Sequence, residues 1–236
     1  MKLYKYLKRE FAIGMMKDGL IKVGTLYDFR IQEDMERGDK NEGKKHSVTP
    51  IDETLTITNA NDLPGNFKQL VNHTGGTLIL NKGSSGILNQ GVKDSYVYCC
   101  STKFEKALLQ SFEAEVCIEI FDSVAFAREI MKQMSALEYS YGATIGGDCS
   151  YIGHEVLDSV TDSAHFLKDK EYKHQHEYRY LFPPLVRKDG KIIPPIISLE
   201  NGKHKIDVPN VGDINNDIIP VVIECKEAIQ FCRVIS

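Results

Sequence analysis

The chain has 236 residues, of which 42% are hydrophobic and 26% are charged. This composition is ordinary for a globular protein and excludes the disordered and fibrous classes. Lys and Arg number 29 and Asp and Glu number 33, so the net charge of −4 gives no global attraction to nucleic acid or to an anionic membrane.

The two ends of the chain and its cysteines favour a cytoplasmic protein. Charged residues interrupt the first nine positions too often for a secretory signal. The apolar run at 218–223 is far shorter than the roughly 20 residues that span a bilayer, so we expect no membrane partner. Without an export signal, the six cysteines are expected to be buried, reduced thiols. The absence of a Cys-x-x-Cys pair disfavours a zinc ribbon.

Apolar spacing predicts strands and helices that alternate irregularly along the chain. The predicted strands are Leu3–Tyr6, Leu20–Val23, Ser95–Ser101, Glu115–Phe121, His176–Phe182, Ile196–Leu199 and Ile218–Cys225, with weaker ones at Tyr139–Thr144 and Ser150–Gly153 around a Gly146-Gly147 turn. The predicted helices are Lys8–Asp18, Lys103–Gln110, Ser123–Leu137 with Ser123 as its cap, and Asp162–Lys170. Asn, Gly and Ser dominate 59–91, which predicts a loop-rich insertion around one strand at 77–80.

Strands outnumber helices in this order, and most connections are too short for repeated βαβ crossovers. The sequence therefore predicts an α+β fold with a largely antiparallel sheet. Since no linker, internal repeat or low-complexity tract divides the chain, residues 1–236 are expected to form a single domain.

Common catalytic motifs, such as phosphate-binding glycine loops and His-Glu-x-x-His, are missing from the chain. The first of three remaining polar clusters is the charged run from Arg30 to Glu42. Arg30 follows the apolar segment 26–29, so its anchored side chain could offer a rigid fork to a phosphate or carboxylate. Charged runs of this kind are usually solvated helix ends and loops, which is the alternative reading.

The second cluster is Ser101-Thr102 at the end of a predicted strand. Short hydroxyl side chains at such a position can hold a ligand. They can equally cap the helix that follows, and for this pair alone the sequence favours the capping role.

The third cluster lies between Tyr172 and Tyr180. On a strand, Gln175, Glu177 and Arg179 share one face, which either meets water or lines a polar cleft. An ion pair between Glu177 and Arg179 is the simpler account of this face. The two histidines at 174 and 176 lack further ligands at recognisable spacing, so no metal site is predicted there.

The order of these clusters, an Arg, then Ser101-Thr102, then Gln175-x-Glu177, resembles the Arg–Ser–Glu arrangement of ADP-ribosyltransferases. The opening of the chain is similar to that of DarT-like members and of an uncharacterised bacterial family linked to phage defence. That second family shares further motifs with this chain, which are Arg30…Arg37-Gly38-Asp39…Glu42-Gly43 and Lys168…Tyr172…Glu177-Tyr178-Arg179.

The resemblance implies a split two-sheet core with flanking helices and NAD as substrate. It implies that Glu177 is the catalytic carboxylate, beside the positive charge that develops on the ribose, and that Gln175 orients the acceptor. Lys5 stands where DarT-like proteins place a His that touches NAD. The other residues that it implies contact NAD are Tyr4, Tyr6, Arg30, Arg37, Ser101, Thr102 and Tyr178.

The function that these residues suggest is an NAD-dependent ADP-ribosyltransferase, a toxin or phage-defence effector that modifies a protein or nucleic acid and has an antitoxin or partner protein. One alternative is a non-catalytic module of the same fold that binds a nucleotide or a protein. Another is a metal-dependent hydrolase or nuclease that uses Asp34, Asp39, Glu42 and the histidines.

Overall fold

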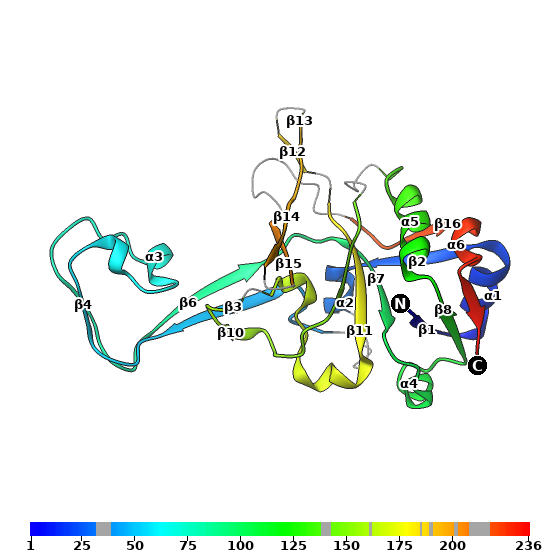
Figure 1. The fold of residues 1–236 in the computed structure, drawn as a ribbon, viewed down its shortest axis with the longest axis horizontal. Coiled ribbons are helices and arrows are strands. Elements are labelled where there is room, and N and C mark those ends of the chain that lie inside the picture. Colours follow the sequence, from blue (N-terminus) through cyan, green and yellow to red (C-terminus); the bar gives the residue numbers. More distant parts are fainter. Residues whose placement is uncertain are drawn as a thin grey trace.

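The computed structural model describes residues 1–31, 39–137, 143–160, 162–184, 186–188, 191–200, 203–207 and 218–236. Helices and mostly antiparallel strands form a body from which a long arm projects (Figure 1), which confirms the predicted α+β class. The strands are β1 Leu3–Leu7, β2 Leu20–Thr25, β3 Lys44–Pro50, β4 Leu55–Ile57, β5 Leu78–Leu80, β6 Ser85–Gly91, β7 Tyr96–Ser101, β8 Val116–Ile120, β9 Ile145–Asp148, β10 Glu155–Leu157, β11 Glu177–Phe182, β12 Val186–Lys188, β13 Lys191–Ile193, β14 Ile196–Glu200, β15 Lys203–Asp207, β16 Val221–Glu224 and β17 Cys232–Val234.

The helices are short, apart from the three-turn α5. The α-helices are α1 Arg9–Ile13, α2 Leu26–Ile31, α3 Phe67–Leu70, α4 Lys106–Ser111, α5 Ser123–Met134 and α6 Lys226–Ile229. A π-helical turn (η1, Gly14–Asp18) continues α1, and 3-10 turns form η2 (Ala60–Asp62), η3 (Ala164–Phe166) and η4 (Lys170–Gln175). No helix among the described residues has the length and apolar character needed to traverse a bilayer.

The eight-stranded sheet of the body forks at β7. One edge of β7 pairs along its whole length with β11. Its other edge pairs with β2 at Tyr96 and Val97 and with β1 at Ser101. Between these ends, the described residues place no β1 or β2 partner opposite Tyr98, Cys99 or Cys100. The sheet therefore divides into a β2–β16 branch and a β1–β8–β17 branch.

The main core lies between the forked sheet and α5 with α6. Phe126, Ile130 and Met134, spaced along one face of α5, are fully buried against apolar residues of β1, β7, β8 and β11. Such spacing of three and four residues is what places apolar side chains on one helix face. The helix starts where its sequence predicts, but its cap is Asp122, whose Oδ1 accepts a hydrogen bond from the Ala125 amide at 3.0 Å. The prediction that Ser123 is the cap is therefore wrong by one residue.

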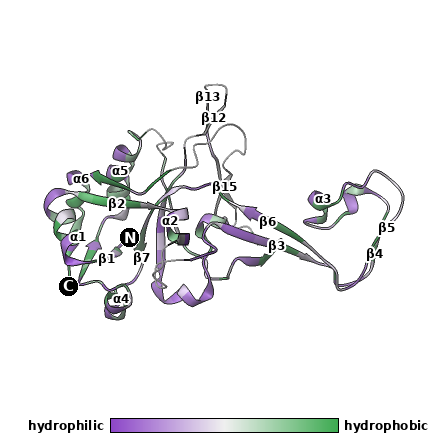
Figure 2. Ribbon diagram, turned by 180° about the vertical axis from the view of Figure 1, so that it is seen from behind, coloured by the Kyte–Doolittle hydropathy of each residue, from purple (hydrophilic) through white to green (hydrophobic). Residues whose placement is uncertain are grey.

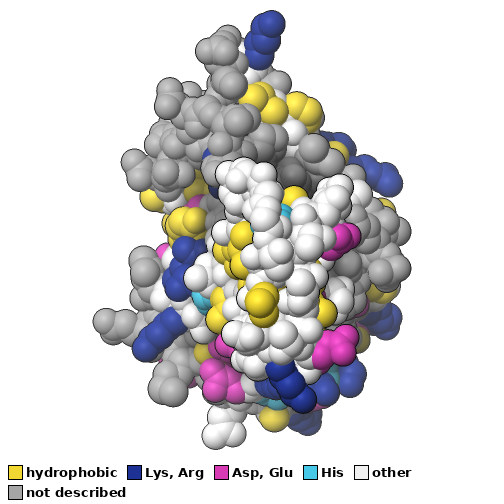
Figure 3. All heavy atoms as spheres, turned by 90° about the vertical axis from the view of Figure 1, so that its left-hand side faces the viewer, with side chains coloured by type: hydrophobic (Ala, Val, Ile, Leu, Met, Phe, Trp, Pro, Cys, Tyr) yellow, Lys and Arg dark blue, Asp and Glu magenta, His cyan; other side chains and the backbone are white. Residues whose placement is uncertain are grey.

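The arm is a long hairpin, in which β3 and β6 pair over seven residues each, with β10 parallel to β3. At the far end of the arm (Figure 1), the β4–β5 pair and the short helices η2 and α3 enclose a small apolar core of their own. The end of the arm, seen face-on in Figure 3, carries mainly uncharged side chains. The segment predicted as a loop-rich insertion, 59–91, forms the second half of this arm.

Asn66 holds the arm together, because its buried side chain joins both strands of the hairpin. Its Nδ2 donates to the Ser47 carbonyl at 2.6 Å and to the Gly86 carbonyl at 3.3 Å. Substitution of Asn66 with Leu leaves these acceptors without that donor, so we expect a local loss of roughly 1–3 kcal/mol. Hydrogen exchange of arm amides should speed up while body amides are unchanged. Asn72→Leu, outside this network, is the control, and equal protection in the two variants would contradict the role of Asn66.

Besides the Ser123 cap, three sequence predictions of local structure are wrong. Ser150–Gly153 forms an isolated bridge at Ser150 and no strand. Gly146 and Gly147 lie inside strand β9 and not in a turn. A Cβ at Gly146 would stand 2.2 Å from the Tyr178 hydroxyl, so glycine is needed for the close approach of the ring and not for a turn. Residues 162–170 form no α-helix, because Ser150 forms backbone hydrogen bonds with Phe166 and Lys168 and keeps the segment after η3 extended.

The cysteines behave as the sequence predicts. All six are free thiols, five of them buried and Cys99 half-buried. Burial raises the pKa of the Cys99 thiol well above its usual range, which disfavours a thiolate nucleophile at this position.

Candidate functional site

A pocket with a volume of about 630 Å³, including its open mouth, lies where the sheet forks. Strands β1, β7 and β11 supply most of its wall, and α2, the end of α4, the loop before β3 and the segment around η4 supply the rest. Its lining combines aromatic rings, three cations and two carboxylates: Tyr4, Lys5, Tyr6, Phe29, Glu42, Cys99, Cys100, Ser101, Phe112, Lys168, Gln175, Glu177 and Arg179. Rings with a few convergent charged groups are typical of a pocket that binds an anionic aromatic ligand.

Lys5 spans the fork itself. Its Nζ donates a hydrogen bond to the Cys99 carbonyl at 2.7 Å, at a point where β7 has no partner strand on that side. The same ammonium lies 4.6 Å from the centre of the Tyr98 ring. Lys5 also borders a second pocket on the β2 side of the fork, and Tyr6, Phe29 and Cys99 line both spaces. The two pockets therefore adjoin along β7.

A row of four buried charges forms the wall opposite β1. Arg179 makes a bidentate ion pair with Glu42, with N–O distances of 2.5 and 2.9 Å. Its Nε donates to Glu177 Oε1 at 2.6 Å, and the other oxygen of Glu177 pairs with Lys168. Lys168 also donates to Gln175 Oε1 at 2.8 Å. Two cations and two carboxylates thus neutralise one another, which is the condition under which buried charges are tolerated.

These neighbours keep Glu177 ionised. Burial by itself raises the pKa of a carboxyl, but the charges of Arg179 and Lys168 outweigh it and hold the pKa of Glu177 well below its usual range. Burial likewise lowers the pKa of Lys168, and the charge of Glu177 reverses this and raises it. The backbone of Glu177 is fixed as well, since its amide donates to the Tyr151 hydroxyl. The pocket therefore presents a carboxylate, and not a carboxylic acid, at neutral pH.

His165 lies behind this row and is neutral. Its carbonyl accepts a hydrogen bond from Arg179 Nη1 at 2.7 Å, its Nδ1 lies 2.8 Å from the Ser163 hydroxyl, and its Nε2 has no hydrogen-bond partner among the described residues. Burial, and then the charge of Arg179, lower the pKa of His165 to about 3. A protonated imidazole at this position would add an uncompensated buried charge.

This neutral histidine should make the fold sensitive to acid. The unfolded chain protonates His165 near pH 6.5, whereas the folded chain does so only near pH 3. The stabilising contribution is therefore lost as the pH falls through this window, by about 2 kcal/mol between pH 6.5 and 5. We expect the free energy of unfolding of His165→Asn, measured in denaturant, to fall by about 2 kcal/mol less than that of the wild type between pH 6.5 and 5. A control at an exposed histidine, His174→Asn, should keep the wild-type slope, and a wild-type slope in His165→Asn would disprove the assignment.

The pocket brings together six of the ten residues predicted for the site. Glu177 and Gln175, predicted as catalytic, line it with Tyr4, Lys5, Tyr6 and Ser101, which come from three separate parts of the chain. The predicted alternation also holds, because Glu177 and Arg179 face the pocket while Tyr180 lies in the main core. Gln175 reaches the pocket from η4, ahead of the strand.

Three predicted residues that the structure describes lie elsewhere. Arg30 donates its Nε to the Glu42 carbonyl at 2.5 Å and stacks over the Tyr27 ring, so it supports the loop that carries Glu42. Thr102 donates to the carbonyl of His176 through both its amide and its hydroxyl. It thereby fixes the residue before Glu177, where φ is +47°. Tyr178 packs on the opposite face of β11, edge-on to Tyr180. Arg37 lies outside the described residues.

The predicted capping role of Ser101 is wrong, because the residue at the N-cap of the next helix, α4, is Glu105. The Ser101 hydroxyl donates to the Lys103 carbonyl at 2.9 Å and accepts from the Lys103 amide at 3.2 Å, so it shapes the turn after β7. The same side chain borders the pocket.

Three charged residues of the pocket were not predicted as site residues. Glu42, Lys168 and Arg179 complete the charged row, and all three lie in the motifs on which the resemblance to the phage-defence family depends. The sequence shows these three charged residues at separate places. It does not show that they pair with one another, because 137 positions separate Glu42 from Arg179.

The residues named for a metal-dependent hydrolase do not converge in the pocket. Glu42 is engaged by Arg179, and Asp39 lies 3.1 Å from His154. His174 and His176 are not near-neighbours of a third ligand in the described chain, where Asp39, His154 and Asp169 are the one such group found. Asp34 lies outside the described residues.

The chain matches no protein-family model, no curated protein and no solved structure. The resemblance to ADP-ribosyltransferases therefore stays a prediction that depends on short motifs.

Proposed function

We propose that this chain is an NAD-dependent ADP-ribosyltransferase whose active site is the pocket at the fork of the sheet. The observation that carries the proposal is the placement of Glu177. It is an ionised, almost fully buried carboxylate that faces a pocket lined by aromatic rings and by Lys5, Lys168 and Arg179. NAD offers what this lining can bind, namely flat aromatic rings, riboses and a negatively charged pyrophosphate.

The reaction breaks the bond between nicotinamide and ribose. Its electron pair leaves with nicotinamide, and positive charge develops on the sugar until the acceptor forms the new bond to the same carbon. A preorganised carboxylate beside that carbon lowers the energy of this state. Glu177 supplies the carboxylate, and Gln175, held by Lys168 at 2.8 Å, orients the acceptor. The acceptor is a protein or nucleic acid, as the resemblance implies for a toxin or defence effector with a neutralising partner.

Lys5 pairs with the pyrophosphate, a role that the resemblance implies for Arg30 or Arg37. Its ammonium is located at the fork, between the two adjoining pockets, whereas Arg30 is committed to the Glu42 carbonyl. Tyr4, Tyr6 and Phe112 offer rings for stacking against the nicotinamide or adenine.

The test is to incubate the purified chain with NAD and to follow free nicotinamide by chromatography. Release with multiple turnovers is expected, together with binding of NAD in calorimetry. A chain that neither binds NAD nor releases nicotinamide, alone or with a cell extract as source of acceptor, would refute the proposal.

A non-catalytic nucleotide-binding module is the second candidate, and one observation favours it. Both oxygens of Glu177 are already paired, one with Arg179 and the other with Lys168, which neutralises much of the charge that would stabilise the sugar cation. Calorimetric binding of NAD without any nicotinamide release in the same preparation would establish this function in place of catalysis.

A further inference from the structure

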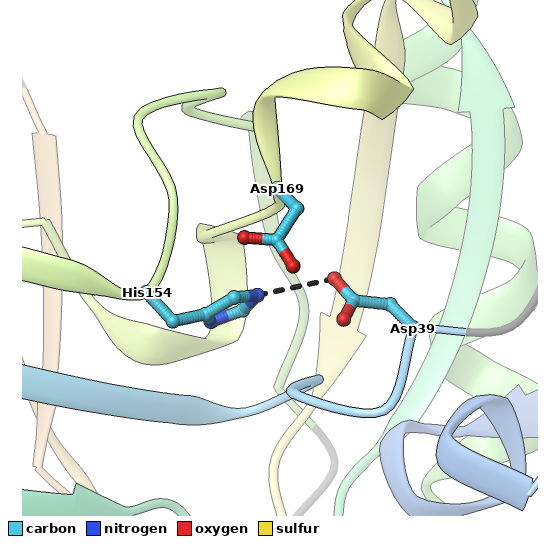
Figure 4. A group of neighbouring side chains, drawn as sticks. All are labelled: Asp39, His154 and Asp169. Carbon is cyan, nitrogen blue, oxygen red and sulfur yellow. Dashed lines mark hydrogen bonds and ion pairs between the residues drawn. The ribbon is translucent and has the colours of Figure 1, made fainter.

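Three side chains from distant parts of the chain meet beside the charged row. Asp39 precedes β3, His154 precedes β10, and Asp169 is the residue before η4. Figure 4 shows the carboxylate of Asp169 pointing toward the space between the imidazole of His154 and the carboxylate of Asp39. One ligand atom of each residue lies within 4.8 Å of the other two.

The hydrogen bond that His154 makes through Nδ1 determines whether Nε2 can act as an acceptor or as a metal ligand. Nδ1 lies 2.8 Å from the Lys44 carbonyl, which is an acceptor, so Nδ1 carries a hydrogen. In the neutral imidazole, Nε2 then carries no hydrogen and has a free lone pair. This nitrogen lies 3.1 Å from the Asp39 carboxylate. Two acceptors at this distance need a cation between them, which is either a proton or a metal ion.

The Asp39–His154 pair has the spacing of two metal ligands, and Asp169 lies within 4.8 Å of both. Two ligands, each about 2.0–2.1 Å from a tetrahedral zinc ion, lie roughly 3.3 Å apart, close to the Nε2–Oδ2 distance of 3.1 Å. A histidine that donates its other N–H to a backbone carbonyl has the orientation usual in metal sites. Side chains of Asp39 and His154 are 2% and 3% exposed. Asp169 is half-buried, so it leaves a route for the ion and for a water ligand.

Charge also fits a divalent cation. Two carboxylates and a neutral imidazole carry −2, which one divalent ion cancels. Lys168, the nearby cation that also acts on Asp39, is already paired with Glu177. One nitrogen and several oxygens suit zinc or manganese better than copper or an iron–sulfur cluster.

The geometry points to a binding site for one divalent transition-metal ion, Zn²⁺ or Mn²⁺, formed by Asp39, His154 and Asp169. Two of the three ligands stand close in sequence to the charged row, Asp39 three residues before Glu42 and Asp169 directly after Lys168. A bound ion would fasten the two loops that supply these residues to the His154 loop. It acts as a clamp on the pocket wall and does not contact the reacting bond, so the site is independent of the proposed NAD chemistry.

Manganese is the better first probe, because the six free cysteines would also attract zinc. After chelator treatment and desalting, the full chain should bind one Mn²⁺ per molecule, measured by calorimetry and by loss of the free-ion paramagnetic resonance signal. Asp169→Asn, at the half-buried ligand, is expected to keep the fold and to weaken binding at least ~10-fold. His154→Gln should abolish binding, and circular dichroism must show that this variant is folded.

Asp62→Asn, an exposed change in the arm, is the matched control and should bind as the wild type does. Bound ion should also raise the melting temperature of wild type and of this control but not of Asp169→Asn. No binding by wild type at millimolar Mn²⁺ and Zn²⁺ would overturn the site and leave a protonated His154–Asp39 ion pair. Equal binding by wild type and Asp169→Asn would overturn it as well. Neither result depends on whether NAD is cleaved.

Discussion

Replacing Arg179 with Met is expected to lower the free energy of unfolding by roughly 3–5 kcal/mol, a large part of the stability of a domain. Arg179 is 1% exposed, and its side chain donates to Glu42, Glu177 and the His165 carbonyl. Methionine fills a similar volume but leaves Glu42 without its bidentate partner. The cost is the desolvation of a buried carboxylate that has lost its counter-charge. Urea unfolding followed by circular dichroism measures the change.

The matched control is Arg233→Met. Arg233 also pairs with a glutamate, Glu119, at 2.9 Å, but its side chain is 59% exposed. Because Arg233 is exposed and Lys2 also pairs with Glu119 at 3.2 Å, loss of this pair should cost about 0–1 kcal/mol, and the control should unfold almost as the wild type does.

A double variant separates charge from packing. Arg179→Met with Glu42→Gln removes one positive and one negative charge together, so it should recover part of the stability lost in the single variant. If Arg179→Met cost no more than Arg233→Met, the charged row would not be the buried network described above.

Replacing Glu177 with Gln should reduce the rate of nicotinamide release by roughly 10²–10³-fold or more, if the proposed function holds. Glutamine is nearly the same size but carries no charge to stabilise the developing sugar cation. Because it also leaves Lys168 and Arg179 one counter-charge short, folding must be checked by circular dichroism and NAD binding by calorimetry. A folded variant that binds NAD within a few-fold of wild type isolates the catalytic step.

Glu177→Asp is the companion variant. It keeps the negative charge, so it should disturb folding less than Glu177→Gln does. It should retain the ion pairs in part and lose activity because its carboxylate is withdrawn from the sugar. Glu53→Gln, an exposed change in the arm, controls for the substitution itself. Wild-type turnover in both Glu177 variants would remove this residue from the mechanism.

Local sequence patterns were sufficient to predict most strands and helices of the body. The apolar runs of β1, β7, β8 and β11 and the spacing of apolar residues in α5 each predicted an element that the structure contains. The alternation of Glu177 and Arg179 against Tyr178 and Tyr180 was also readable, because it follows from the two-residue period of a strand. In these segments, the same pattern that forms the element also forms its buried face.

Predictions failed where a distant neighbour decides the local conformation. Gly146 and Gly147 have the composition of a turn, yet they form a strand because they pair with Tyr180 and Arg179 of β11. The segment after η3 stays extended because Ser150 supplies its hydrogen bonds. The projecting arm could not be foreseen, since seven-residue pairing of β3 with β6 joins residues about 40 positions apart.

The sequence by itself determined the α+β class, the strands of the body and the face on which Glu177 lies, because these depend on periodicity over a few residues. Tertiary structure alone decided that Glu177 is held by Arg179 and Lys168, that Arg30 supports a loop and that Asp39, His154 and Asp169 meet. Partners of buried charges are chosen by which chain segments the fold brings within about 3 Å, and short-range patterns contain no information about that choice.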